Sequence, residues 1–215
     1  ALAELIAMHL HRLGAAQAQS VTFVADGGVW IWDRLPTIVR LAKLKDVPIY
    51  EVLDCYHAVH HISLALTALG LDDKRRLPAY REYRTLLRNG QWRRVVEELT
   101  ECAVDEPTDS KVWTEINYLR KHGAAGRLKY PTFKSLGLPL GSGAIESNIR
   151  RVINLRMKGN SIYWREETGE AMLQVRAQVL TNRLDERLTS LHRLRLRDGR
   201  TDWRWVPQDM SCKSE

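Results

Sequence analysis

The spacing of hydrophobic residues changes several times along the chain, and each spacing predicts a different element. Apolar residues at helical spacing predict helices at 2–14 and 30–44. Between them, the short β-branched run at 21–25 predicts a buried strand. A second strand is predicted at 48–54 and a third helix at 55–70. The order strand, helix, strand predicts a parallel pair joined by a right-handed crossover.

From residue 72 onward the pattern contains no strand signal. Apolar positions predict helices at 78–89, 91–104 and 109–122, with turn residues between them. The fold class that follows is α/β and mostly helical, with an all-helical insertion after the strand pair.

After the insertion the pattern changes again. The small-residue turn 141–143 leads into a helix that carries Glu146 and ends near Met157. A long basic helix is then predicted from about Arg165 to Leu184 or beyond. The chain therefore divides into four predicted parts, namely a strand-bearing core at 1–71, the insertion at 72–137, a return to the core at 138–198 and a flexible tail at 199–215.

The chain is basic, with a formal net charge of +7 and a pI near 9.5. Residues 147–205 contain 13 Lys and Arg against seven Asp and Glu. Such a surplus favours a polyanion as the partner, and a solvated basic surface is the other interpretation.

Composition also narrows the setting of the protein. No run approaches the ~18 apolar residues of a membrane-spanning helix, so no membrane contact is expected. The three cysteines are scattered and form no Cys-x-x-Cys pair, which favours a reducing compartment and argues against structural zinc. We therefore expect a cytoplasmic protein.

Two acidic residues stand where predicted elements meet turns. Asp26 directly follows the first strand, and Glu146, 120 positions later, follows the candidate N-cap Ser142 by one turn. Open α/β sheets bind ligands at the carboxyl ends of their strands, and Mg²⁺ prefers carboxylate oxygens, water and phosphate as ligands. We predict that Asp26 and Glu146 bind Mg²⁺ or Mn²⁺ for phosphoryl transfer. The alternatives are a turn aspartate and a glutamate placed favourably in a first helical turn.

A third polar group follows the second predicted strand. Asp54 could supply another metal ligand there. His57 and His61 share one helix face, so a zinc pair is conceivable, but no nearby residues complete a four-ligand set. Histidines that pack on a buried helix, one of them orienting a phosphate or a catalytic carboxylate, are the favoured interpretation.

Cations and aromatic residues are mixed in the segment after Glu146. Cations bind phosphates and aromatic rings stack on bases, so this mixture predicts contact with DNA. An amphipathic helix with a solvated basic face and Trp164 in the core is the alternative. The predicted DNA-binding residues are Arg150, Arg151, Arg156, Lys158, Trp164 and Arg165.

The three acidic residues Asp26, Asp54 and Glu146 lie in three motifs of the sequence. These are Val24-Ala-Asp-Gly-Gly-Val-Trp-Ile-Trp32, Leu53-Asp-Cys-Tyr-His-Ala58 and Gly141-Ser-Gly-Ala-Ile-Glu-Ser-Asn-Ile-Arg-Arg151. Together they resemble bacterial insertion-sequence transposases of the Mutator-like DDE group. The resemblance implies a ribonuclease H-like core with a helical insertion before the last catalytic helix. It also implies three acidic residues that hold two Mg²⁺ ions for DNA strand cleavage and transfer. The implied partners are transposon ends and target DNA, bound by a homo-oligomer of the full-length protein on the bacterial nucleoid.

The resemblance implies that Asp26 is the second acid of the triad and Glu146 the third. Only one helix separates Asp26 from Asp54, which leaves no room for the hairpin and helix that follow the first acid in that fold. Asp54 and His57 then correspond to the Cys/Asp-x-x-His element of such transposases. The first acid would lie upstream of Ala1, so the chain resembles the C-terminal portion of a transposase. We expect it to be poorly stable and catalytically inactive by itself.

Two other functions stay open. The chain could be a DNA-binding remnant that regulates an intact transposase and has no chemistry of its own. It could also be a ribonuclease H-like nuclease that uses Asp26, Asp54 and Glu146 as a complete triad.

Overall fold

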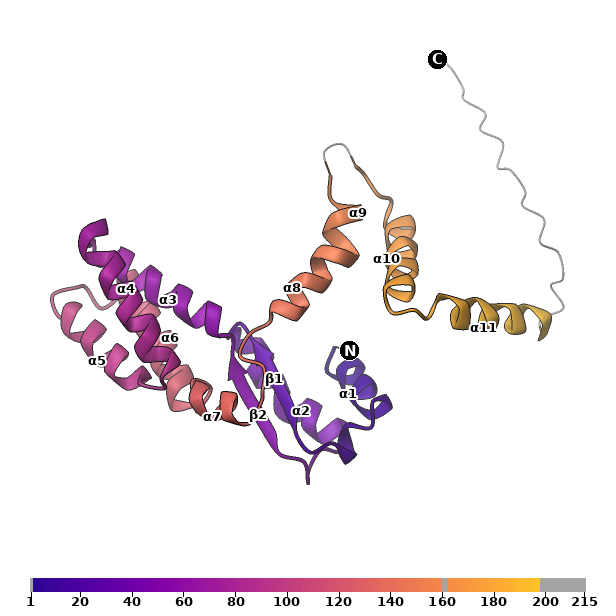
Figure 1. Cartoon of the computed structure of the whole chain (residues 1–215), viewed down its shortest axis with the longest axis horizontal. Coiled ribbons are helices and arrows are strands. Elements are labelled where there is room, and N and C mark those ends of the chain that lie inside the picture. The colour runs from indigo at the N-terminus through magenta and orange to yellow at the C-terminus, as the bar shows by residue number, and fades with distance from the viewer. Residues whose placement is uncertain (1, 160–161, 198–215) are drawn as a thin grey trace, which may run out of the picture. The chain divides into compact units, whose positions relative to one another are not determined.

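The structure is a computed structural model that describes residues 2–159 and 162–197 (Figure 1). The predicted tail at 199–215 therefore lies outside the described residues. The chain forms two compact units, Ala1–Ala144 and Ile145–Glu215. The boundary falls inside the segment that the sequence assigns to a return to the core.

The first unit is built around two parallel strands. β1 (Val21–Ala25) pairs with β2 (Ile49–Leu53), and α2 (Val29–Leu41) connects them. The pairing is in register, with Ala25 opposite Leu53. Both strands therefore end at one edge of the sheet, as the sequence predicts. Every residue of β1 is only half-buried, as expected for a strand with a single neighbour.

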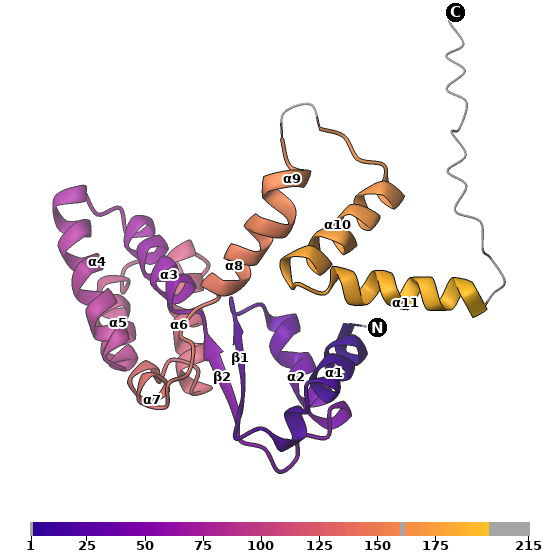
Figure 2. The same cartoon turned by 45° about the vertical axis from the view of Figure 1, so that its right-hand side comes forward.

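Helices lie on both sides of this strand pair. In Figure 2, α1 (Leu2–Arg12) and α2 lie on one side of the strands and α3 to α7 lie on the other. A short 3₁₀ turn, η1 (Ala15–Gln17), connects α1 to β1. A small hydrophobic cluster fixes the α1 side, and its buried members are Ala7, Ala15, Ala42, Leu44 and Val47.

The predicted insertion is all helical in its described residues. It contains α4 (Asp73–Arg88), α5 (Trp92–Cys102), α6 (Lys111–Ala124) and the short α7 (Tyr130–Ser135). These helices share one hydrophobic core with β2 and α3 (Cys55–Ala68), so strands and insertion form a single folded body.

α7 lies outside the helices that the sequence predicts for the insertion. Tyr130 and Phe133 are both buried on this short helix, and Pro131 occupies its first turn, where its missing N–H costs nothing. The Tyr130 hydroxyl also donates to the Leu53 carbonyl oxygen at 3.0 Å. Tertiary burial therefore stabilises a helix that is too short to show a periodic pattern.

The second unit begins with one helical run in three parts. These are α8 (Gly143–Ile149), whose first two residues belong to the first unit, a π-helical turn (Arg150–Asn154) and α9 (Leu155–Met157). The run ends near Met157, as predicted. α10 (Glu166–Leu180) and α11 (Leu184–Arg197) follow it.

The single long helix predicted from about Arg165 to Leu184 is wrong, because the helix ends at Leu180. Asn182 has φ of 54°, in the left-handed region, where asparagine is among the few side chains tolerated. Thr181 caps the end by donating its hydroxyl to the Ala177 carbonyl oxygen at 2.7 Å. The apolar spacing resumes in α11, so the pattern alone does not reveal the interruption.

The two units differ in burial. All buried members of both hydrophobic clusters lie between Ala7 and Phe133, in the first unit. Among the described residues of the second unit, Gly169 alone is buried. No helix in the described ranges is both long and apolar enough to span a bilayer.

Candidate functional site

Asp26 lies in an exposed turn directly after β1, at the sheet edge where both strands end. The Gly28 N–H donates to Asp26 Oδ1 at 3.2 Å, which closes a local turn. Within the described residues, Asp26 Oδ2 accepts no hydrogen bond. One oxygen of this carboxylate is therefore free of hydrogen bonds to the described residues, and ligand binding by Asp26 stays a prediction.

Helix α6 of the insertion contacts the backbone of this turn. The Tyr118 hydroxyl on α6 donates to the Asp26 carbonyl oxygen at 2.7 Å. The His122 ring, one turn further along α6, interacts with the Gly27 backbone, and this interaction by itself favours a higher pKa of His122. Gly27 has φ of 89°, and a Cβ there would collide with the Tyr118 hydroxyl and come within 2.9 Å of Leu53 Cδ1. The turn therefore requires glycine for both its backbone and its packing.

A polar cluster surrounds His122 beneath the turn. His122 is only 1% exposed, and burial followed by the charge of Arg127 lowers its pKa to about 4. Arg127 lies 3.3 Å from the Nδ1 atom of His122 and donates to Glu51 at 2.7 Å. Its guanidinium also lies 4.1 Å from the ring centre of Trp32. His122 is thus kept neutral among fixed partners.

A second pair of side chains supports Tyr118. The His61 ring stacks on it, with ring centres 3.5 Å apart and planes 19° from parallel. His61 Nδ1 also contacts the Glu115 carboxylate. Burial, followed by the nearby carboxylates of Asp26, Asp54 and Glu115, raises the pKa of Tyr118 and keeps its hydroxyl protonated as a donor. Of the histidines in the 57–61 segment, His61 therefore packs against a residue that contacts the Asp26 turn, and that an imidazole there orients a catalytic group stays a prediction.

Asp54 has a different role from the metal ligand considered above. It is 1% exposed and caps α3, where Oδ1 accepts from the N–H groups of Tyr56 at 2.7 Å and His57 at 3.2 Å. Its Oδ2 accepts from the Ser142 N–H at 2.5 Å and the Ser142 hydroxyl at 2.6 Å. Four donors therefore occupy its lone pairs. Burial raises the pKa of this carboxyl, but these hydrogen bonds outweigh burial and lower the pKa.

The bonds of Asp54 and its neighbours join two motifs of the sequence. The Asp54 N–H donates to the Ala25 carbonyl oxygen at 2.8 Å, and the Cys55 N–H donates to Leu140 at 2.9 Å. Ser142 precedes Glu146 by four residues. One side chain thus anchors the turn that leads into α8 to the sheet edge that carries Asp26.

His57 is half-buried in the first turn of α3. Its backbone N–H donates to Asp54, and its ring makes no hydrogen bond within the described residues. Across those residues, no three His, Cys, Asp or Glu side chains are grouped to hold a metal ion.

Glu146 lies in the first turn of α8, where it is exposed and has no side-chain partner among the described residues of its own unit. An anionic side chain is favourable at that end of the helix dipole. Both of its oxygens are available within this unit, so the side chain fits the role of a metal ligand.

The predicted DNA-binding residues fall into two groups by exposure. Trp164 is half-buried, with its Cβ next to Gly169 and its indole N–H unpaired, which limits its use for base stacking. Tyr163 beside it is 93% exposed and is the more accessible ring. The exposed cations are Arg150, Arg151, Arg156, Lys158 and Arg165.

The π-helical turn has a dedicated partner on α10. Arg176 donates to the Val152 carbonyl oxygen at 2.8 Å and also to the Arg151 carbonyl oxygen. The side chain thereby ties the π-helical turn to α10 and leaves the Arg150 and Arg151 side chains exposed. The sequence gives no signal for this contact.

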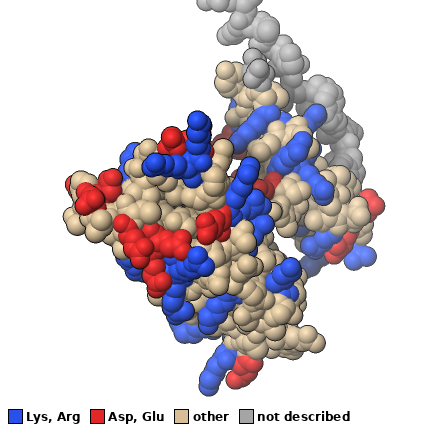
Figure 3. All heavy atoms as spheres, turned by 60° about the vertical axis from the view of Figure 1, so that its left-hand side comes forward, with Lys and Arg blue, Asp and Glu red and all other residues tan. Residues whose placement is uncertain are grey.

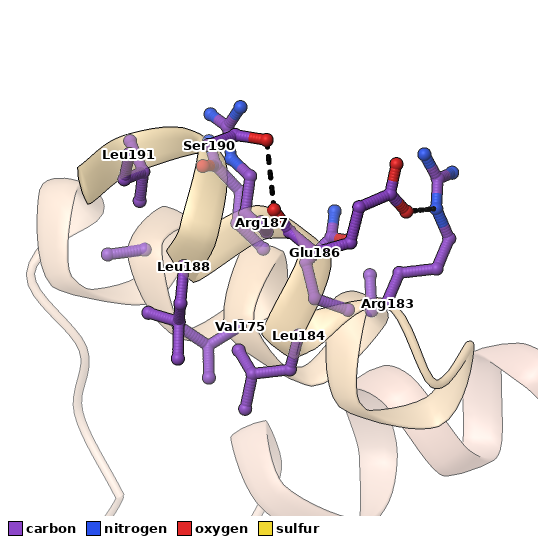
Figure 4. Close-up of a pocket in the computed structure, with 12 residues that line it drawn as sticks. Val175, Arg183, Leu184, Glu186, Arg187, Leu188, Ser190 and Leu191 are labelled. Carbon is purple, nitrogen blue, oxygen red and sulfur yellow. Dashed lines mark hydrogen bonds and ion pairs between the residues drawn. The ribbon is translucent and has the colours of Figure 1, made fainter. Parts of the chain in front are cut away.

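Figure 4 shows a cavity of about 670 Å³ between α10 and α11. Val175, Leu184 and Leu188 form an apolar wall, and an ion pair between Arg183 and Glu186 lies at the rim. The cavity contains none of the predicted site residues. It marks an exposed apolar face of two amphipathic helices.

Charge is mixed on the one face of the molecule that Figure 3 shows. Figure 3 shows basic and acidic side chains interspersed on the face seen there. The net charge of +7 therefore does not by itself identify a binding face. A binding face has to be identified from local groups of charged and aromatic side chains.

Sequence reasoning missed Tyr118 and His122, and it named Ser142 only as a helix N-cap and not as a partner of Asp54. The predicted helix at 109–122 carries polar residues at three- and four-residue spacing, namely Glu115, Tyr118 and His122, which places them on one face. This polar stripe was the sequence signal that could have identified Tyr118 and His122. Comparison of the chain with protein-family models, curated proteins and solved structures finds no match.

Proposed function

We propose that this chain is a C-terminal catalytic-core segment of a DDE transposase, with a partial ribonuclease H-like core interrupted by its helical insertion. The observation that carries the proposal is the Asp26 turn. Asp26 follows a strand of a parallel β–α–β unit, and its exposed carboxylate has one oxygen without a hydrogen bond to the described residues. Helix α6 of the insertion fixes the backbone of the turn through the Tyr118 hydroxyl. Such fixed placement suits an acid that must meet a metal ion and a phosphate.

The proposal assigns a role to the residues that support the Asp26 turn and to those around Glu146. Tyr118 and His122 hold the backbone of the turn, so that the Asp26 carboxylate stays at the sheet edge. Asp54 anchors Ser142 and thereby the segment that leads to Glu146. Arg150 and Arg151 are exposed beyond Glu146 and suit phosphate binding.

Asp26 and Glu146 are the residues that would hold Mg²⁺ or Mn²⁺. When bound, two such ions stabilise the attacking and leaving oxygens of phosphoryl transfer. Asp26 fits because of its free oxygen, and Glu146 fits because it is exposed without a partner in its own unit. Asp54 does not fit, since four donors already occupy its carboxylate. The first acid of the triad is accordingly proposed to come from a preceding segment.

Metal binding tests this assignment directly. Mn²⁺ is titrated into the chain with DNA present and followed by electron paramagnetic resonance. Asp26→Asn and Glu146→Gln are each expected to weaken binding about tenfold, because each removes one anionic ligand. The matched controls Asp33→Asn and Glu170→Gln change exposed acids elsewhere and are expected to leave binding unchanged.

Two results would count against the proposal. If Asp26→Asn weakens Mn²⁺ binding and Glu146→Gln does not, the two residues do not share a metal site. If the chain alone nicks DNA in Mg²⁺, it contains a complete site and the nuclease alternative is favoured. That alternative requires Asp54 as a ligand, and the four hydrogen bonds on its carboxylate argue against it.

A DNA-binding remnant that regulates an intact transposase is the second candidate. The observation that favours it is the group of exposed cations between Arg150 and Arg165 in the second unit. Glu146→Ala separates the two functions when the segment is tested within an intact transposase. A catalytic segment loses strand transfer, whereas a regulatory remnant is indifferent. Either function places the protein on DNA in the bacterial cytoplasm, acting as a homo-oligomer at full length.

A further inference from the structure

A groove of about 1020 Å³ opens in the first unit beside the start of α3. Its walls come from the first turn of α3, the end of α4, α7 and the turn that follows Leu140. Tyr56, Gly141 and Gly143 of this lining belong to the sequence motifs, but the metal site proposed above does not use the groove. The residues that matter for its chemistry are Tyr56, Arg88, Asn89, Lys134, Gly141 and Gly143.

The groove has basic walls. Arg88 and Lys134 are exposed on two different helices, and no Asp or Glu is among the residues that line the groove. Asp54, at the base of α3, is buried and is not part of the lining. Two cations across a groove whose lining contains no anionic side chain favour a polyanionic ligand.

An aromatic ring stands at the edge of the groove. Tyr56 is 70% exposed, although large aromatic rings usually bury most of their area. Its backbone is fixed, because its N–H donates to Asp54 at 2.7 Å. Its ring packs against Gly141, where a Cβ would come within 3.3 Å of Tyr56 Cδ2. The ring is therefore presented to solvent from a fixed position.

Fixed aromatic rings beside cations are typical of sites that bind single-stranded nucleic acid, since each unpaired base offers a face for stacking. We infer that this groove binds single-stranded DNA, with phosphates at Arg88 and Lys134 and a base stacked on Tyr56. The choice of DNA rests on the proposed function. α3 begins directly after β2, and β2 ends beside β1, so the bound strand lies at the sheet edge that carries Asp26.

The test measures binding of a fluorescent single-stranded DNA of about 20 nucleotides to the full chain by anisotropy. The double variant Arg88→Glu with Lys134→Glu is expected to weaken binding about tenfold or more. The control is Lys74→Glu with Arg81→Glu, which changes the net charge equally at exposed positions of α4 outside the groove. It is expected to weaken binding less than about twofold.

Two further measurements examine the separate parts of the site. Tyr56→Leu is expected to weaken binding about tenfold, whereas Tyr56→Phe keeps the ring and binds like the unchanged chain. Neutralising Arg88 and Lys134 to alanine lowers the slope of log K against log salt by about 1.4, at about 0.7 per phosphate contact on a single strand. Circular dichroism confirms that each variant keeps its helices. If the double variant loses helicity, Lys134→Glu alone decides the test.

Several results would overturn the inference. Equal weakening by both charge-reversal pairs means that net charge alone attracts DNA. Full affinity in Tyr56→Leu removes the stacking site, and competition by polyglutamate as strong as by DNA means that the groove takes an acidic peptide. If the groove variants bind fully while Arg150→Glu with Arg151→Glu does not, this inference fails and the proposed function stands. If the unchanged chain binds no DNA, both fail.

Discussion

At the Asp26 turn, Gly27 combines a positive φ with a backbone that touches two side chains. Gly27→Ala introduces strain at φ of 89° and a contact with Leu53 of 2.9 Å, in addition to the collision with Tyr118. We expect it to lower the free energy of unfolding by at least about 2 kcal/mol, measured by urea denaturation.

The matched control for this change is Gly137→Ala. Gly137 also has a positive φ, of 70°, but a Cβ there meets nothing within 4 Å. It therefore reports the backbone strain alone, about 1 kcal/mol. Equal losses in the two variants would show that the contact with Tyr118 does not constrain the turn.

Asp54 offers a second test at the level of one side chain. Asp54→Ala removes an N-cap and leaves the Ser142 N–H and hydroxyl without their acceptor. We expect a loss of about 2–4 kcal/mol in the free energy of unfolding. Asp72→Ala removes the exposed N-cap of α4, whose only described cap bond is to the Arg75 N–H at 2.9 Å, and is expected to cost about 1 kcal/mol. A cost for Asp54→Ala no larger than this would argue against its role in anchoring the 140–142 turn.

Among the elements, α6 carries the stripe that supports the Asp26 turn, and the stripe makes stability depend on pH. The pKa of His122 is about 4 in the folded chain, below its ordinary value of 6.5. The unfolded chain therefore binds a proton between these pH values that the folded chain does not. Stability is full above about pH 6.5 and falls by up to about 3 kcal/mol as the pH falls toward 4.

This dependence is measured by urea denaturation at several pH values from about 7 to about 4.5. His122→Gln keeps a polar side chain but does not titrate, so it should flatten the pH dependence. His192→Gln on exposed α11 is the control and should leave the dependence intact. An unchanged slope in His122→Gln would assign the acid sensitivity to other groups.

At the scale of the whole molecule, burial is concentrated in the first unit. Both hydrophobic clusters lie there, whereas Gly169 is the one buried residue among those described in the second unit. We expect amide hydrogens of α10 and α11 to exchange much faster than those of α3 and α6, measured by mass spectrometry. The fragment 1–144 should show the same thermal midpoint as the full chain. Equal protection in the two units, or a lower midpoint for the fragment, would contradict this.

The prediction that the isolated chain is poorly stable can be refined at the same scale. β1 has one neighbour and is half-buried throughout, which leaves an unpaired strand edge in the described part of the chain. The shared core of β2, α3 and the insertion is nevertheless extensive. Aggregation through the β1 edge is therefore the expected weakness of this chain, rather than a lack of core.

Local patterns determined much of this protein. The β-branched run at 21–25, the following Asp-Gly-Gly and the helical spacing of the insertion were sufficient to predict parallel strands, a strand-end acid and an all-helical segment, because each depends on neighbours in sequence. Only the tertiary structure decided that Tyr118 and His122 support Asp26, that Asp54 caps α3 and holds Ser142, and that Tyr56 edges a basic groove. These contacts join residues up to 92 positions apart. Hydrophobic periodicity carries no information about which distant polar groups meet once a core has formed.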